Sequence, residues 1–101
     1  MKRDEALDKA KTFICGDRDR DYGSPKGSFE LIAKLWSAYL GVDLKARDAG
    51  IMMALLKIAR LKTSGKVDSS LDLIGYGACI TELDTEVDVE NTPDYKKNIP
   101  N

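Results

Sequence analysis

Residues 49–61 read AGIMMALLKIARL, and this stretch decides the fold. Every residue in it except Lys57 and Arg60 is apolar or glycine. Such a pattern is typical of a helix that neighbouring elements contact on most sides. We therefore expect a central helix over residues 44–63, with Asp43 as its N-cap.

Helical periodicity predicts three further helices, over residues 3–15, 25–40 and 69–83. No run of alternating apolar and polar residues within these segments indicates a strand. The sequence therefore predicts an all-α, compact four-helix domain over residues 1–83. An acidic and polar tail follows over residues 84–101, where we expect a frayed end or an arm that pairs with another chain.

Turn residues predict where the second helix begins and ends. Ser24 stands before Pro25 and is a good N-cap, with Ser28 as the alternative. Gly41 is a natural stop for the same helix. In the fourth helix, Gly75 and Gly77 each cost roughly 1 kcal/mol against alanine. Close packing of these glycines, for instance against the central helix, would explain their presence.

Composition limits the classes of function. The chain has 101 residues with 16 basic and 17 acidic side chains, so its net charge offers no general attraction for nucleic acid. Its longest apolar run, over residues 49–56, is too short to span a membrane, and its first residues lack the apolar stretch of a signal peptide. We expect a cytoplasmic protein without a membrane partner.

The reactive side chains are few. The sequence contains no histidine, which removes the Ser/His and Cys/His arrangements of nucleophilic catalysis. Cys15 and Cys79 lack CxxC spacing, and we expect both to be reduced thiols in the core. Any catalysis would rest on carboxylates, lysine, tyrosine or a metal.

The predicted core joins the second, third and fourth helices. Its members are apolar residues at helical spacing: Trp36, Met52, Leu55, Leu56, Ile58, Leu71 and Ile74. Because the chain is short and its central helix is apolar nearly all round, we expect a homo-oligomer.

Three charged residues interrupt the apolar helices: Lys57 and Arg60 on the third, and Asp72 on the fourth. Burial of an unpaired charge is costly, so these groups must face one another, a cleft or water. One interpretation is an interhelical ion pair that sets the packing register. The other is a polar cleft in which Lys57, Arg60 and Tyr76 bind a phosphorylated ligand.

Two further groups of residues are candidates for ligand binding. Asp68 and Asp72 are four residues apart on one helix, a spacing that suits Mg²⁺, although Asp68 is also a good N-cap. The loop before the second helix offers cations, an aromatic ring and a hydroxyl close to a helix N-terminus. Its candidate residues are Arg18, Arg20, Tyr22 and Ser24. A solvated loop with local Arg–Asp pairs is the alternative.

The segment CGDRDRDYGS at residues 15–24 and the segment MMALLKIAR at residues 52–60 resemble a family of small phage and prophage proteins of unassigned function. The likeness covers about residues 5–83. More distantly, the layout resembles the all-α nucleotide pyrophosphohydrolases of the MazG and dUTPase type and phage nucleotide-modification-associated domains. That second likeness implies Mg²⁺ held by an ExxE pair and an ExxD pair. This sequence has no ExxE, and Asp68 and Asp72 are one residue further apart than the second pair.

We therefore expect a phage-encoded helical protein in the cytoplasm of the bacterial host that binds a nucleotide or another phosphorylated small molecule, with sequestration of a host signal as one use of such binding. One alternative is a Mg²⁺-dependent nucleotide pyrophosphohydrolase, so the sequence leaves open whether the protein is an enzyme. The other alternative is a structural or interaction module without a ligand. An open cleft around Lys57, Arg60 and Asp72 favours ligand binding, whereas burial and mutual pairing of these residues favour the interaction module.

Overall fold

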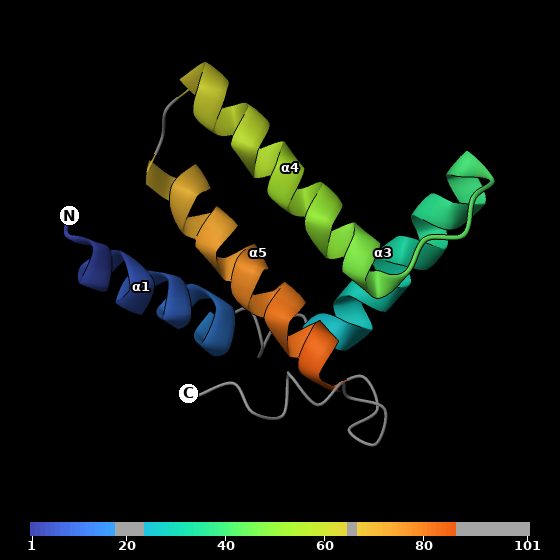
Figure 1. The fold of residues 1–101 in the computed structure, drawn as a ribbon, viewed down its shortest axis with the longest axis horizontal. Coiled ribbons are helices and arrows are strands. Elements are labelled where there is room, and N and C mark those ends of the chain that lie inside the picture. The colour runs from blue at the N-terminus through green and yellow to red at the C-terminus, as the bar shows by residue number, and fades with distance from the viewer. Residues whose placement is uncertain (18–23, 65–66, 87–101) are drawn as a thin grey trace.

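The polypeptide forms a series of helices without a strand among the residues that the structure, a computed structural model, describes: 1–17, 24–64 and 67–86. In chain order these elements are α1 (Arg3–Thr12), the π-helical segment η1 (Phe13–Asp17), α3 (Pro25–Leu40), α4 (Ala46–Ser64) and α5 (Val67–Glu86). The predicted all-α fold with four helices is confirmed (Figure 1).

Helix α3 begins and ends where the turn residues predict. The Ser24 side chain accepts a hydrogen bond from the Gly27 N–H over 3.4 Å, and Pro25 occupies the first helical position. At the other end Gly41 has a φ of 71°, in the left-handed region where glycine carries no Cβ penalty. Ser24 is therefore an N-cap in this structure.

Helix α4 begins two residues later than the sequence predicts. The Leu44 N–H donates to the Ser37 hydroxyl over 2.8 Å, which ties this part of the connection back to α3. The Lys45 N–H donates to the Asp48 carboxylate over 2.9 Å, so Asp48 closes the first turn of α4 from within. Asp43, the predicted N-cap, instead forms an ion pair with the side chain of Lys45.

Helix α5 starts at Val67 and ends at Glu86, so it extends beyond the predicted range at both ends. The first residues of the predicted tail, 84–86, are helical, and the rest of the tail lies outside the described residues. None of the helices that the described residues form is long and apolar enough to cross a membrane.

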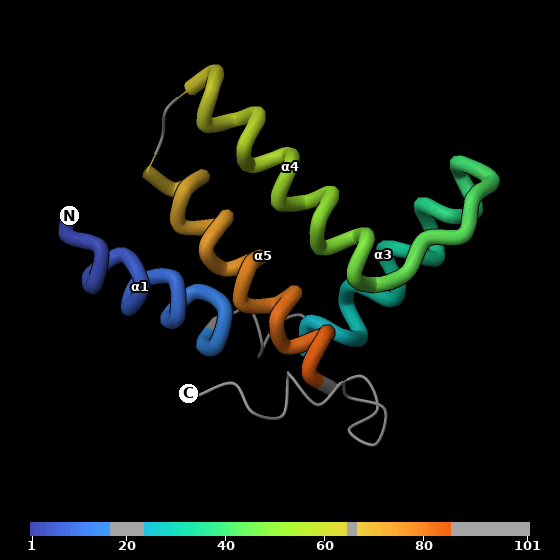
Figure 2. Tube along the Cα trace, in the orientation of Figure 1, coloured from blue at the N-terminus to red at the C-terminus, as the bar shows by residue number. Residues whose placement is uncertain are grey.

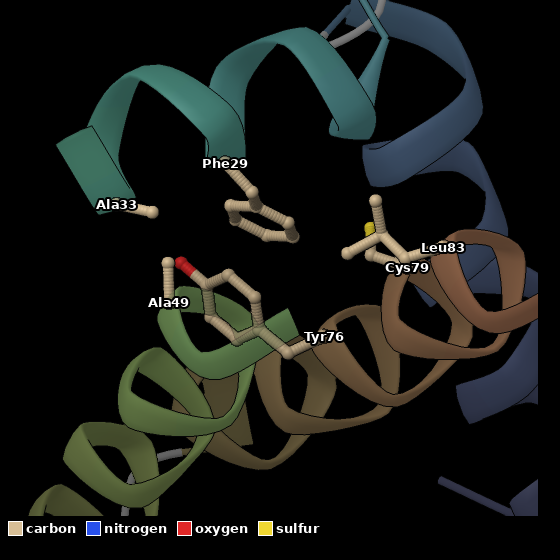
Figure 3. Close-up of a cluster of buried hydrophobic side chains, with 6 residues drawn as sticks. All are labelled: Phe29, Ala33, Ala49, Tyr76, Cys79 and Leu83. Atoms are coloured by element: carbon tan, nitrogen blue, oxygen red, sulfur yellow. The ribbon is translucent and has the colours of Figure 1, made fainter. Parts of the chain in front are cut away.

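Helices α4 and α5 form an antiparallel hairpin, and α1 lies on the other side of α5 (Figures 1 and 2). Helix α3 crosses the hairpin where α4 starts and α5 ends, and its C-terminal half extends away from it. The buried cluster lies at this crossing, shown in Figure 3. Its members come from α3, α4 and α5: Phe29, Ala33, Ala49, Tyr76, Cys79 and Leu83.

The core prediction is partly wrong for the single chain. Leu71 is buried, and Trp36, Met52 and Ile74 are half-buried. However, Leu55, Leu56 and Ile58 are 57%, 44% and 49% exposed. The reason is that α5 covers one side of α4 and α3 covers only its start, which leaves the outer side of α4 bare.

Close packing explains only one of the two glycines in α5. A Cβ at Gly75 would lie 2.7 Å from Cγ2 of Ile14, so the close neighbour is η1 and not α4. A Cβ at Gly77 would meet open space. The thiols differ too: Cys79 is buried as expected, but Cys15 on η1 is exposed, and no disulfide joins them.

Candidate functional site

Lys57 of α4 and Asp72 of α5 form the interhelical ion pair that one interpretation of the sequence predicts. The Lys57 Nζ lies 2.8 Å from the Asp72 Oδ2. The Lys57 side chain is only 16% exposed and that of Asp72 is 39% exposed. The cation thus crosses the helix interface and is largely covered, while the carboxylate reaches water.

Two other predicted ligand-binding residues, Arg60 and Tyr76, differ from each other in their surroundings. Arg60 is exposed and makes no ion pair with a described residue. Tyr76 is 9% exposed and belongs to the core, where its ring centroid lies 6.2 Å from that of Phe29. Figure 3 shows the hydroxyl end of Tyr76 directed toward Ala33 and Ala49.

The predicted loop site has only one described member. Ser24 lies at the start of α3, where its hydroxyl caps the helix. Arg18, Arg20 and Tyr22 lie outside the described residues. Their role in binding a ligand stays a prediction.

The predicted Mg²⁺ pair does not make a metal centre with its described neighbours. Asp68 is exposed in the first turn of α5, where its charge suits the helix dipole, and α5 begins before it. Asp72 already accepts from Lys57. Within residues 1–17, 24–64 and 67–86 no three His, Cys, Asp or Glu side chains come together as metal ligands. Mg²⁺ binding by Asp68 and Asp72 stays a prediction.

Sequence reasoning missed a charged cavity where α3, α4 and α5 meet. Its volume is about 180 Å³. It is lined by three cations, two carboxylates and two apolar residues: Lys26, Lys45, Arg47, Glu30, Asp84, Ala46 and Leu83. We name it the junction cavity.

Two ion pairs order the rim of the junction cavity. The Arg47 Nε donates to the Asp84 Oδ1 over 2.8 Å and so links the start of α4 to the end of α5. The Lys45 Nζ lies 2.8 Å from the Asp43 Oδ2. This hydrogen bond, together with the carboxylate charge of Asp43, raises the pKa of the Lys45 ammonium above its usual value. Lys45 therefore carries its charge at neutral pH.

A second cavity, of about 350 Å³, lies between η1, the start of α3 and α5, and both thiols line it. Cys15 reaches it from η1 and Cys79 from α5. No pattern in the sequence indicates that the two cysteines, 64 positions apart, line one cavity. They do so because η1 lies against α5, where Ile14 contacts Gly75.

An exposed apolar surface lies on the C-terminal part of α3 and on the turn after it. Residues 35–42, LWSAYLGV, contain no charged side chain. Leu35, Tyr39, Leu40 and Val42 are 61%, 89%, 54% and 52% exposed. We name residues 35–42 the arm.

These features define a class: a small all-α domain with a charge pair between its central helices, a charged cavity at its helix junction and a bare apolar arm. A family model described as a domain of unknown function, DUF6378, matches residues 5–84, and the chain belongs to that family of phage proteins.

Two curated relatives come from mycobacteriophages. The chain is 39% identical to the Gene 55 protein of Mycobacterium phage D29 over 88 residues, which are 86% of this chain and 58% of that protein. It is 40% identical to the Gene 55 protein of Mycobacterium phage L5 over 79 residues, which are 76% of this chain and 51% of that protein. The chain thus spans about half the length of these relatives.

The predicted phage family is confirmed by these matches. The likeness to nucleotide pyrophosphohydrolases gains no support from them. No solved structure matches the chain.

Proposed function

We propose that this domain is a self-associating helical interaction module in which two copies pack through their arms. The observation that carries the proposal is the arm itself, an uncharged apolar surface in a chain that is 33% charged. Apolar patches of this kind on small proteins mark interaction sites. The cores of protein interfaces are likewise depleted of charge and enriched in aromatic residues.

The arm continues the buried side of α3. Phe29 and Ala33 are buried against α4 and α5, and Trp36 is half-buried. Leu40 lies on the same stripe at helical spacing, yet it is 54% exposed. The stripe therefore has the pattern of a packed surface over its whole length, but its last member, Leu40, is exposed in the single chain.

Helix α4 offers a surface that suits such an arm. Ile51, Leu55 and Ile58 follow one another at spacings of four and three residues, which places them on one stripe. At ~100° per residue this stripe lies away from Met53 and Lys57, which face α5. We name Ile51, Leu55 and Ile58 the outer stripe.

The energetics favour a second copy as the occupant. Covering a half-exposed aliphatic side chain contributes about 1 kcal/mol. Association costs roughly 4–15 kcal/mol in lost freedom of motion, so a single arm against a polar surface is too little. In a twofold pair, each arm lies on the outer stripe of its partner, and both contacts contribute.

The charge pair also supports the interaction module over the alternatives. The Lys57 side chain is only 16% exposed and pairs with Asp72 across the helix interface, so its ammonium offers little accessible charge to a phosphate there. Nucleotide binding through Arg18, Arg20 and Tyr22, and a role for Mg²⁺, stay predictions.

Replacement of Tyr39 by glutamate tests this function. Tyr39 is 89% exposed in the single chain, so Tyr39→Glu should leave the helical content and thermal unfolding of the monomer intact. In a self-associated pair the new charge would be desolvated, and dimerisation should weaken at least about tenfold. Sedimentation velocity over a concentration series measures both proteins.

Lys34→Glu is the matched control, because Lys34 is an exposed residue of the same helix outside the arm. It should dimerise like the wild-type chain. A wild-type chain that stays monomeric at ~100 μM, or a Tyr39→Glu variant that dimerises normally, would overturn the proposal. In the first case the arm would have another occupant, such as a host or phage protein.

A further inference from the structure

We infer that the junction cavity binds a small organic phosphate whose organic part is a single ring. This inference does not depend on self-association, because the cavity lies at the start of α3 and the arm lies at its end. It also concerns residues other than the loop and the Lys57 region in which the sequence predicts a ligand.

The cations of the cavity come from the starts of α3 and α4, and an ion pair with α5 holds the start of α4 in place. Lys26 comes from the first turn of α3, and Lys45 and Arg47 flank the first residue of α4. The pair between Arg47 and Asp84 fastens this end of α4 to α5. The positive groups are therefore placed by helix ends that are already joined.

The cations retain donors that the described residues of the chain do not use. Arg47 donates through Nε to Asp84, which leaves its terminal nitrogens available. Lys45 pairs with Asp43, which is not part of the cavity wall, and an ammonium has further donors. Lys26 makes no ion pair with a described residue. Phosphate oxygens are suitable acceptors for these charge-assisted hydrogen bonds.

The rest of the cavity wall limits which organic group the bound phosphate can carry. Leu83 and Ala46 provide apolar surface, together with the methylene stems of the lysines. The volume of about 180 Å³ suits one ring, since an apolar cavity of about 150 Å³ holds a benzene molecule. The Glu30 carboxylate at the same cavity can accept a hydrogen bond from a ring hydroxyl or amino group.

A thermal-shift and calorimetric titration of the full chain tests the inference. The probes are phenyl phosphate and ribose 5-phosphate, each with one ring, and inorganic phosphate and adenosine monophosphate serve as comparisons. A ligand that binds the folded state raises its melting temperature. We expect both single-ring phosphates to raise it, with the stronger of the two identifying the ring. Inorganic phosphate lacks the ring, and adenine exceeds the cavity, so both should bind more weakly.

Lys26→Glu and Lys34→Glu form a matched pair for the same titration. Both replace an exposed lysine of α3, but only Lys26 lines the cavity. A glutamate in the first turn suits the helix dipole, so Lys26→Glu should fold. It should weaken binding of the single-ring phosphate at least about tenfold, and Lys34→Glu less than about twofold.

Four results would overturn the inference. The first is the absence of a shift with either single-ring phosphate at ~10 mM. The second is an equal loss of affinity in the two lysine variants, which would indicate a diffuse field and not a site. Inorganic phosphate that binds as tightly as the organic phosphates would remove the role of the ring. Adenosine monophosphate that binds as tightly would remove the limit on its size.

Discussion

The ammonium of Lys57 is a largely covered charge between α4 and α5. Its effect on the stability of the fold depends on its ion-pair partner, Asp72. Asp72 lies 2.8 Å away on the neighbouring helix, with 39% of its side chain exposed. A pair of this kind stabilises less than its distance alone indicates, because water screens the carboxylate. Loss of the carboxylate is different, since it leaves a largely covered ammonium without an acceptor.

We predict that Asp72→Ala lowers the free energy of unfolding by about 1–2 kcal/mol. Urea denaturation followed by circular dichroism measures this change. Asp43→Ala is the control, because the pair between Asp43 and Lys45 has the same length of 2.8 Å but side chains that are 80% and 73% exposed. That variant should lose less than about 0.5 kcal/mol. Equal losses in the two variants would show that burial of Lys57 contributes nothing.

Helix α5 contains two glycines that look alike in the sequence and differ in their surroundings. At Gly75 the backbone of α5 is in contact with Ile14 of η1, where a Cβ would lie 2.7 Å from the Ile14 Cγ2. At Gly77 the space beside the helix is open. Gly75 therefore allows η1 to approach, while Gly77 has the helix-propensity cost without a contact in return.

We predict opposite effects for the two alanine substitutions. Gly77→Ala should raise the free energy of unfolding by about 1 kcal/mol, the difference in helix propensity. Gly75→Ala should lower it, because Cγ2 of Ile14 is fixed to a branched Cβ and the whole segment must shift. Chemical denaturation of both variants gives the two signs.

The double variant Ile14→Ala with Gly75→Ala checks the mechanism. Removal of Cγ2 should relieve the clash, so that Gly75→Ala becomes neutral or stabilising in that background. A Gly75→Ala variant that is as stable as Gly77→Ala in the wild-type background would contradict this account.

The stability of the whole domain depends on a small hydrophobic core. Phe29 is 1% exposed and is the largest fully buried side chain among the described residues. It lies where α3 crosses the hairpin, between α4 and α5. A domain of this size has a total stability of only about 5–15 kcal/mol, so one such side chain accounts for much of it.

We predict that Phe29→Ala lowers the free energy of unfolding by about 3–5 kcal/mol. Phe13→Ala is the matched control, because Phe13 is 43% exposed on η1 and its loss should cost less than about 1.5 kcal/mol. Thermal unfolding followed by circular dichroism should show a broad or absent transition for the first variant only. Similar melting temperatures for the two would mean that α3 is not held through Phe29.

The sequence by itself determined the helices and several of their ends, because periodicity, an N-cap and a left-handed glycine act within a few residues. Ser24 and Gly41 bound α3 in this way. It also determined that Lys57 needs a partner, since a charge on an apolar helix has few alternatives.

Only the tertiary structure decided which apolar residues are covered and which charges meet. The pattern of α4 is apolar on nearly all sides, yet Leu55 and Ile58 are exposed because α3 covers only the first part of α4. The junction cavity depends on Arg47 and Asp84, which are 37 positions apart and which no local pattern connects. Helical periodicity states which face of a helix is apolar, but the crossing of the helices determines which part of that face is buried.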